Sequence, residues 1–369
     1  MKALTITPKV AHQVQLRDVP EPSLDDIPNG RGVLVRIIRV GLDGTDHEIY
    51  EGLYGEAPAG SDFLIMGHES FGVVEAVGSA VTEFKPGDYV VARVRRAGSS
   101  FYDQIGMPDF TTDEDYYEHG ISRVHGFLTE KYVEEPEYLI LIPPGLKEIA
   151  VLLEPTSIVE KGIAQAFEVQ QRLKIWRPQC AAVLGVGSVG LLAAVALRNL
   201  GLDVYGFART EPPYLNSELL EAIGGHYVST RQTPLADVAA AHHGFDLVFE
   251  ASGYSPLAFE AMNDTLDKNG VLVLSSVTGG STTITIPSDQ INMKFVLGNR
   301  VVVGTVNANR EHFEAGVRDM ALREAITPGW FGRLITDRIG GLNDWQTAYE
   351  RLGAEGAIKV IVEISPEPA

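Results

Sequence analysis

The sequence predicts an α/β protein with two domains, one of alternating strands and helices and one built mainly of strands. The chain has 369 residues, which is more than a single ordinary core contains. Short β-rich runs dominate its first 95 residues, and strand-like and helix-like segments alternate from about residue 181 onward. Such alternation is typical of βαβ units around a parallel sheet.

The predicted elements of the first domain are short strands and one helix. Strands are expected at 33–42, 72–78, 88–94 and 137–144, where β-rich runs are separated by Gly, Pro and Asp. Between Arg95 and Arg123 the pattern fades into a long polar loop, and loops of this length in compact domains are often functional. Apolar residues at helical spacing predict a helix over 149–173.

The second half of the chain alternates regularly. Strands are expected at 180–187, 202–209, 226–230, 245–252, 270–277 and 301–307, and helices at 188–201, 217–225 and 255–266. The C-terminal run 357–364 has strand character, and we expect this strand to rejoin the first domain.

The composition excludes several classes of partner. The chain carries 49 acidic and 30 basic residues, a formal net charge of -19, which argues against nucleic acid or an anionic membrane surface. Its one cysteine, Cys180, permits no internal disulfide. The 18 uncharged residues Cys180 to Leu197 contain three glycines, and we interpret them as a strand, turn and helix rather than a membrane span. The N-terminal segment lacks an apolar signal core, so we expect a cytoplasmic protein.

A glycine motif marks the start of the alternating region. Gly185, Gly187 and Gly190 form G-V-G-S-V-G, which leaves an apolar strand and opens an apolar helix. The first glycine permits a tight turn, the second lets the backbone approach a pyrophosphate, and the third lets helix pack on strand. The sequence therefore predicts a Rossmann nucleotide-binding domain over 171–309, with cofactor contacts from Gly185, Val186, Gly187, Ser188, Val189 and Gly190.

The strand after the glycine motif indicates which dinucleotide binds. NAD-binding domains place an acid near the end of that strand to bind the ribose hydroxyls. Here the strand ends in Ala208, and Arg209 and Thr210 follow. A guanidinium and a hydroxyl suit the 2′-phosphate of NADP. We therefore predict a preference for NADP, while Glu211 leaves NAD open and Arg231 is a second candidate contact.

Three motifs before the glycine fingerprint resemble a known family. They are G-L-D-G-T-D-H at 41–47, G-H-E-S-F-G at 67–72 and L-E-P at 153–155. In this order they resemble the zinc-containing medium-chain dehydrogenase/reductase (alcohol dehydrogenase) family over nearly the whole chain. The strings at 94–96, 117–121, 124–126 and 305–307 are most similar to archaeal-type glucose dehydrogenases. The resemblance implies a mainly β GroES-like catalytic domain, expected over 1–170 and 310–369.

The resemblance also implies one catalytic zinc. It places Asp43 and His68 as ligands, with Glu69 or Glu154 completing the set, and an open position for substrate. Most family members carry cysteine where Asp43 stands, and an oxygen and nitrogen set binds zinc less tightly. Glu154 is equally suited to direct ligation and to a supporting or substrate-binding role. A four-cysteine structural zinc is excluded, because the stretch 95–115 contains no cysteine.

The remaining site residues follow from the same resemblance. Thr45 is expected to hydrogen-bond the reacting hydroxyl and start a proton path, which His47 continues unless it merely faces solvent. Glu118 and Glu154 are the expected sugar-binding carboxylates, and Asn307, at the end of a strand, is expected to bridge substrate and nicotinamide. Further cofactor contacts are expected from Ser276, Val277 and Lys359. His119 and His125 are expected to be ordinary loop histidines rather than extra metal ligands, and packing roles are expected for Phe101, Phe110, Tyr116 and Tyr117.

The expected function is metal-dependent oxidation of an aldose to its lactone, with hydride transfer to NADP. D-glucose is the first candidate substrate and D-galactose the second. A polyol or secondary-alcohol dehydrogenase of the same family stays open, as does an NADPH-binding reductase or sensor without sugar turnover. The G-H-E motif argues against the metal-free reductases. We expect a homodimer or homotetramer with a small sugar as its partner, and neither nucleic acid nor membrane.

Overall fold

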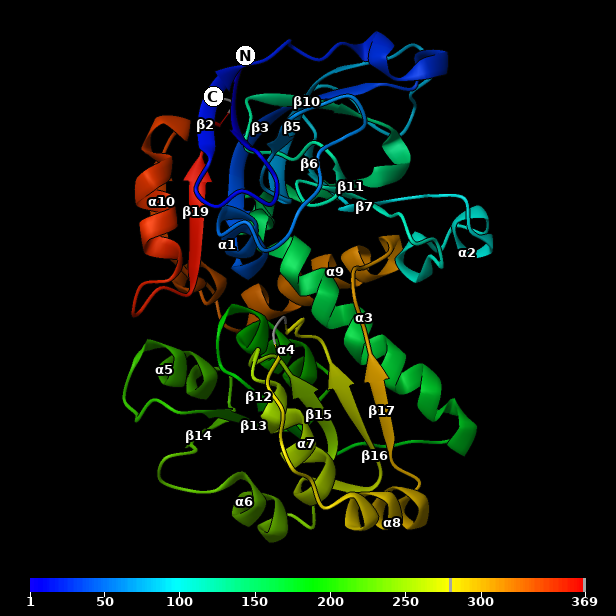
Figure 1. Cartoon of the computed structure of the whole chain (residues 1–369), viewed down its shortest axis with the longest axis vertical. Helices are drawn as coiled ribbons and strands as arrows, with labels where there is room; N and C mark the ends of the chain where they lie inside the picture. Colours follow the sequence, from blue (N-terminus) through cyan, green and yellow to red (C-terminus); the bar gives the residue numbers. More distant parts are fainter. Residues whose placement is uncertain (279–280, 368–369) are drawn as a thin grey trace. The chain divides into compact units, whose positions relative to one another are not determined.

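The computed structural model describes residues 1–278 and 281–367, which form two compact units. Unit 1 comprises Met1–Glu154, Asn307–Val317 and Phe331–Ala369, and unit 2 comprises Pro155–Val306 and Arg318–Trp330. Figure 1 shows the elements of both units coloured along the chain. The predicted boundaries at 170 and 310 stay predictions.

Unit 2 is built on a six-stranded parallel sheet with the order β14-β13-β12-β15-β16-β17. Its strands are β12 (Cys180–Leu184), β13 (Asp203–Ala208), β14 (His226–Ser229), β15 (Phe245–Glu250), β16 (Leu266–Leu274) and β17 (Val301–Gly304). In this order the first strand of the unit, β12, lies inside the sheet between β13 and β15, as in doubly wound dinucleotide-binding sheets. The central strands are apolar and buried because helices cover a parallel sheet on both faces.

Two groups of helices pack against this sheet (Figure 1). The helices are α3 (Leu153–Gln170), α4 (Ser188–Asn199), α5 (Leu215–Ala222), α6 (Leu235–Ala241), α7 (Ser255–Asp264) and α8 (Ser288–Gly298). Helices α4 and α5 contact each other over β12 to β14, whereas α7 contacts α6, α8 and β16. The uncharged run from Cys180 is thus a strand followed by a helix. Among the helices that the structure describes, none has the length and apolarity needed to cross a membrane.

Unit 1 contains a seven-stranded sheet with the order β11-β6-β5-β3-β19-β18, in which β10 also pairs with β3. Its strands are β3 (Val33–Leu42), β5 (Glu69–Val77), β6 (Tyr89–Ala92), β10 (Lys131–Glu134), β11 (Leu139–Ile142), β18 (Ile335–Gly340) and β19 (Lys359–Glu363). The C-terminal strand β19 pairs antiparallel with β3. This pairing confirms that the end of the chain rejoins the first part of the sequence.

Smaller elements complete unit 1. Two three-stranded sheets consist of β1 (Lys2–Ile6), β2 (Val14–Asp18) and β4 (Leu64–Ile65), and of β7 (Arg95–Arg96), β8 (Tyr117–His119) and β9 (Arg123–Val124). The remaining α-helices among the described residues are α1 (Gly44–Tyr50), α2 (Phe101–Gln104), α9 (Arg310–Ile326) and α10 (Trp345–Leu352). The stretch predicted as one long loop therefore contains short strands, the helical turn α2 and a 3-10 helix at Pro108–Phe110.

The sequence prediction missed several helices, and the physical cause is clear for one of them. The prediction omitted α1, α2, α6, α8, α9 and α10, and it extended β17 to residue 307 although the strand ends at Gly304. Helix α9, with the sequence R-E-H-F-E-A-G-V-R-D-M-A-L-R-E-A-I, carries charged residues on all sides, so its apolar positions make no clear helical stripe. Local periodicity predicts an element only where one face is clearly more apolar than the other.

Candidate active site

The glycine turn of unit 2 has the geometry that a dinucleotide requires. Gly185 follows β12 with a φ of 93°, which favours glycine. A Cβ added at Gly190 would lie 1.9 Å from the carbonyl oxygen of Gly185, so helix α4 approaches the strand too closely for any side chain. At Gly187, by contrast, no described atom lies within 4 Å of an added Cβ. The turn thus combines close packing with an open backbone where a pyrophosphate would approach.

The start of α4 fits a phosphate group. Its N-cap residue, Gly187, has no side chain to accept a hydrogen bond from the first turn. The hydroxyl of Ser188 is buried and has no hydrogen-bond partner among the described residues. Asn216 at the start of α5 donates to the carbonyl oxygen of Val186 over 2.6 Å and so fixes the turn. Unsatisfied donors at a helix N-terminus bind anions, so these residues fit a cofactor phosphate.

The loop after β13 presents an arginine to solvent from a fixed backbone. The hydroxyl of Tyr227 donates to the carbonyl oxygen of Thr210 over 2.6 Å, and that of Ser229 donates to the carbonyl oxygen of Arg209 over 3.3 Å. The side chains of Arg209 and Thr210 are exposed. These two hydrogen bonds order the loop while leaving the guanidinium accessible to an anion.

Two further predicted cofactor residues follow the end of β16. The Ser276 hydroxyl accepts a hydrogen bond from the Gly253 backbone amide over 3.2 Å, and the side chain of Val277 is exposed. Both residues lie beyond the carboxyl end of a parallel strand, where ligands of such sheets bind. Their role as cofactor contacts stays a prediction.

Asp43 and Asp46 begin helix α1 in unit 1 as a reciprocal cap. One oxygen of Asp43, Oδ1, accepts hydrogen bonds from the amides of Thr45 and Asp46, and Asp46 Oδ2 accepts from the amide of Asp43. This capping box satisfies the first amides of the helix and orients both carboxylates. It leaves Asp43 Oδ2 without a capping role.

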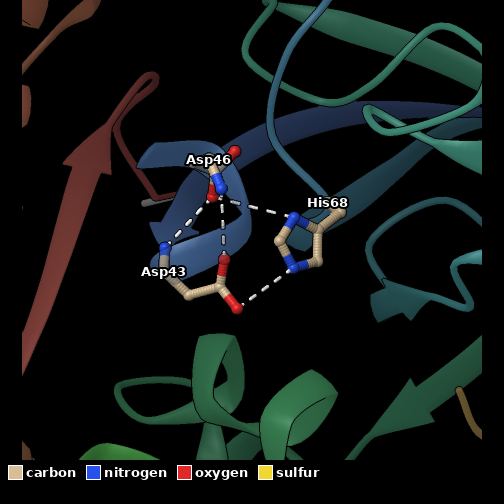
Figure 2. Close-up of side chains that lie close together, drawn as sticks. All are labelled: Asp43, Asp46 and His68. Carbon is tan, nitrogen blue, oxygen red and sulfur yellow. Dashed lines mark hydrogen bonds and ion pairs between the residues drawn. The ribbon is translucent and has the colours of Figure 1, made fainter. Parts of the chain in front are cut away.

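His68 lies between these two carboxylates (Figure 2). Its Nε2 is 3.6 Å from Asp43 Oδ2, and its Nδ1 is 3.7 Å from Asp46 Oδ2. Both separations exceed the length of a hydrogen bond. Two atoms bound to one zinc ion are roughly 3.3 Å apart, so the Nε2–Oδ2 pair has nearly the spacing of two metal ligands. Asp46, on the other ring nitrogen, occupies the place of a carboxylate that orients a ligand histidine.

Two buried glutamates also lie close to His68. Ligand atoms of His68, Glu69 and Glu154 all lie within 4.8 Å of one another. Glu69 pairs with Lys359, whose Nζ lies 2.5 Å from Oε1 and 2.8 Å from Oε2 and also donates to the Leu42 carbonyl oxygen. The ammonium of Lys359 is thereby committed to Glu69 and the backbone. Its predicted contact with the cofactor stays untested.

The charges of this cluster favour a cation. Burial raises the pKa of Asp46 to about 7 and that of Glu154 to about 8, and it also raises the pKa of Glu69. Burial opposes the charged form of His68, yet Asp43 and Asp46 raise its pKa well above the ordinary value. Protons therefore occupy the cluster until a divalent cation displaces them. The buried nitrogen and carboxylate donors fit such an ion, and their hardness leaves room for metals other than zinc.

Glu118 and Asn307 form a second polar group in unit 1. The side-chain amide of Asn307 donates to Glu118 Oε1, and both side chains are buried. Asn307 lies three residues beyond β17 with a φ of 58°, so the prediction that it ends a strand was wrong. A Cβ at Gly120 would lie 2.2 Å from the carbonyl oxygen of Gly67, so the segment after Glu118 packs directly against the residue before His68.

Other predicted side chains differ in their surroundings. Thr45 is half-buried in the first turn of α1, whereas His47 is exposed. Both ring nitrogens of His119 are occupied, by Glu134 and the carbonyl oxygen of His125, as expected for a histidine that is not a metal ligand. The expected packing of Phe101 was wrong, because this side chain is 67% exposed on the single turn α2.

Sequence reasoning missed two residues that contact the candidate site. Asp46 was overlooked as the partner of His68, although the D-x-x-D spacing at 43–46 is a capping-box signal. Arg95, whose guanidinium donates two hydrogen bonds to Glu118 Oε1, was quoted only as part of a family string. No sequence signal pairs Arg95 with Glu118, because the contact depends on the antiparallel pairing of β7 with β8.

Comparisons with known proteins agree with this geometry. A profile of the alcohol dehydrogenase GroES-like domain matches residues 29–144. A profile of the glucose dehydrogenase C-terminus matches residues 147–364, more than half of the chain. The chain belongs to the glucose dehydrogenase family of the alcohol dehydrogenases. The predicted fold class, a Rossmann domain with a GroES-like catalytic domain, is confirmed.

Individual members of the glucose dehydrogenase family are similar over their full length. The glucose 1-dehydrogenase of Methanocella arvoryzae is 42% identical over 99% of both chains. That of Halobacterium salinarum is 36% identical over 98% of this chain and 99% of its own. A Haloferax mediterranei glucose dehydrogenase, solved with NADP, Zn and gluconolactone, superposes with a TM-score of 0.88 at 33% identity, covering 99% of this chain and 100% of that one.

A more distant structure shares the fold alone. The 2R,3R-butanediol dehydrogenase of Bacillus subtilis superposes with a TM-score of 0.78 at 23% identity and covers 99% of both chains. One architecture thus supports different substrates, so substrate choice depends on the side chains of the site.

Proposed function

We propose that the protein is a zinc-dependent glucose 1-dehydrogenase, which oxidises an aldose to its lactone and reduces NADP. The observation that carries the proposal is the pair His68 Nε2 and Asp43 Oδ2, 3.6 Å apart within a buried carboxylate cluster. The pair occurs in a chain 42% identical to a glucose 1-dehydrogenase. Oxidation of a hydroxyl carbon is promoted by a Lewis acid that withdraws charge from the oxygen. A metal ion is such an acid, and this cluster fits one.

Asp43 and His68 are the first two ligands of the proposed ion. Glu154 is the better third ligand, because Lys359 already contacts both oxygens of Glu69. Asp46 Oδ2 lies 3.7 Å from His68 Nδ1 and is proposed to accept a hydrogen bond from it when the ion is bound. When bound, the ion supplies a Lewis acid that lowers the pKa of the substrate hydroxyl.

The protein's own residues bind the sugar and release its proton. Thr45, in the first turn of α1 beside Asp43, is proposed to hydrogen-bond the reacting hydroxyl and to relay its proton by giving up its own. His47 is exposed at the next position but one and is proposed to pass this proton to water. Glu118 and Asn307 are proposed to hydrogen-bond the remaining hydroxyls and orient the ring.

The cofactor site is proposed for unit 2. The open backbone at Gly187 and the unpartnered Ser188 hydroxyl suit the pyrophosphate, and exposed Arg209 suits the 2′-phosphate of NADP. The Haloferax mediterranei relative was solved with NADP and Zn, which supports both assignments. The cytoplasm contains an NADP pool and keeps cysteine thiols reduced, which suits an NADP-dependent enzyme with a single cysteine. We propose the cytoplasm as the location.

One assay tests the proposal. NADP reduction is followed across D-glucose, D-galactose, other aldoses, polyols and secondary alcohols, before and after chelation and after zinc is restored. We expect an aldose to be the best substrate, with activity lost on chelation and regained with zinc. Preferential turnover of a polyol would contradict the aldose assignment and indicate a polyol dehydrogenase of the same family. Activity that chelation leaves intact would remove the metal from the mechanism.

We also infer a homo-oligomer. Strand β17 ends the parallel sheet, and an exposed apolar group lies on the adjoining helix α8: Met293, Val296 and Leu297. An unpaired strand beside exposed apolar residues favours pairing with a second copy.

A further inference from the structure

We propose that Arg95 is a positioning residue which fixes Glu118 so that this subsite accepts only hydrogen-bond-donating hydroxyls of the sugar. The inference rests on the proposed function and adds the chemistry of the groups that the subsite selects. Three contacts carry it: two from Arg95 and one from Asn307, all to the same oxygen of Glu118.

Glu118 Oε1 is saturated by protein donors. Arg95 Nε and a terminal guanidinium nitrogen lie 3.1 and 2.7 Å from it, and the side-chain amide of Asn307 donates to the same atom. The arginine therefore does not form the usual fork across both carboxylate oxygens. Glu118 Oε2 receives no hydrogen bond from residues 1–278 or 281–367. This oxygen keeps its accepting capacity, and a substrate hydroxyl can donate to it.

Asn307 offers a second acceptor in the same way. Its amide nitrogen is committed to Glu118, so the carbonyl oxygen of its side chain remains for a ligand. The subsite thus presents two acceptor oxygens. A ligand group that only accepts, such as fluorine, a carboxylate or a phosphate, finds no donor from Glu118 or Asn307.

Neighbouring residues keep Arg95 in place without the ligand. Arg95 and Glu118 are direct cross-strand partners on β7 and β8. The guanidinium lies 4.7 Å from the centre of the Tyr116 ring, and the hydroxyl of Tyr116 contacts that of Tyr54. Only 5% of Arg95 is exposed. A buried, stacked arginine loses little further freedom on binding, so it orients Glu118 in advance.

The test compares glucose with its 2-, 3-, 4- and 6-deoxy and deoxyfluoro analogues in the zinc-loaded enzyme. Fluorine keeps the size and accepting ability of a hydroxyl but cannot donate. At the hydroxyl that Glu118 contacts, we expect the fluoro and deoxy sugars to lose similar amounts of kcat/KM, on the order of 10- to 100-fold. Full activity of every fluoro sugar would overturn the proposal.

The Arg95→Gln variant assigns this loss to the arginine. We expect KM for glucose to rise about tenfold or more while kcat changes less. We also expect the ratio of kcat/KM for glucose to kcat/KM for the sensitive fluoro sugar, here called the fluoro penalty, to fall toward one. Arg95→Lys keeps the charge with a single donor nitrogen, and we expect intermediate values. An unchanged fluoro penalty in both variants would overturn the role of Arg95.

Two controls separate the possible failures. Arg123 lies on the neighbouring strand β9 and pairs with Glu56 and Asp115, so Arg123→Gln removes a similar ion pair without touching Glu118. We expect it to leave the fluoro penalty intact. The double variant Arg95→Gln with Glu118→Gln should lose little more than Glu118→Gln alone, and fully additive losses would contradict action through Glu118. Wild type that oxidises no aldose would overturn the proposed function and this inference together.

Discussion

At the residue scale, Asp43 combines a cap and a candidate ligand in one side chain. Its Oδ1 accepts the first amides of α1, and its Oδ2 faces His68 Nε2. A cysteine at this position would accept hydrogen bonds poorly and would cap the helix less well. The carboxylate therefore exchanges some metal affinity for a better helix start.

Substitutions of Asp43 separate these two roles. Asparagine caps as well as aspartate, so metal-free Asp43→Asn should keep its unfolding free energy, whereas metal-free Asp43→Ala should lose about 1 kcal/mol. Both variants should lose most bound zinc and turnover. Thermal unfolding after chelation and metal analysis before it measure the two effects. Full zinc occupancy in Asp43→Asn would remove Asp43 from the ligand set.

Arg209 provides the second prediction at this scale. Its exposed guanidinium can contact the 2′-phosphate that only NADP carries. We expect Arg209→Ala to weaken NADP binding by about 1.5–3 kcal/mol and NAD binding far less. Titration of both cofactors by fluorescence measures this difference, with exposed Arg177→Ala as a control in the same unit. Equal weakening of both cofactors would contradict the assignment.

At the scale of elements, helices α3 and α9 share a pair of acids within unit 2. Glu160 belongs to α3 and Asp319 to α9. Burial, followed by the charge of Asp319, raises the pKa of Glu160 to about 8, and Glu160 Oε1 has no hydrogen-bond partner among the described residues. The folded protein therefore retains a proton that the unfolded chain releases near pH 4.5.

This proton makes stability depend on pH. Because the pKa is raised on folding, the stabilisation is complete below about pH 4.5 and is lost as pH rises through about 8. Glutamine stays neutral at every pH, so the Glu160→Gln variant does not lose this stabilisation. The melting temperature of the variant minus that of wild type should therefore increase as the pH rises from 5 to 8.5. Exposed Glu314→Gln, also on α9, is the control for the loss of a glutamate side chain. A difference for Glu160→Gln that does not change with pH would show that Glu160 is ionised throughout.

At the scale of the whole molecule, the net charge and the sheet edge at β17 have opposite effects on self-association. A net charge of -19 keeps copies apart, whereas the apolar group on α8 favours association. An interface that buries Val296 and Leu297 would offset this repulsion, and salt should strengthen it by screening.

A charge on this surface tests the interface. Leu297 is 73% exposed, so Leu297→Glu should fold normally yet shift the protein to a smaller species. Light scattering coupled to size-exclusion chromatography measures the mass. Leu200→Glu is the matched control, because Leu200 is 53% exposed at the end of α4. An unchanged mass in Leu297→Glu would place the interface elsewhere.

Features that depend on local spacing are predictable from the amino-acid sequence alone. The glycine motif at 185–190 and the arginine after β13 each lie within a short window. Periodicity and turn chemistry act over such windows, because backbone geometry relates residues that are near in sequence. For the same reason the motifs at 43–47 and 67–72 are recognisable from the order of their residues alone.

The contacts between these motifs depend on the folding of the whole chain. Lys359 and Glu69 are 290 positions apart, and Asn307 and Glu118 are 189 apart, yet each pair is in contact. Arg95 meets Glu118 through the pairing of two very short strands that carry almost no β signal. Burial and strand pairing between distant segments bring these partners together. A buried charge is stabilised by an opposite charge that the packing of the chain places beside it.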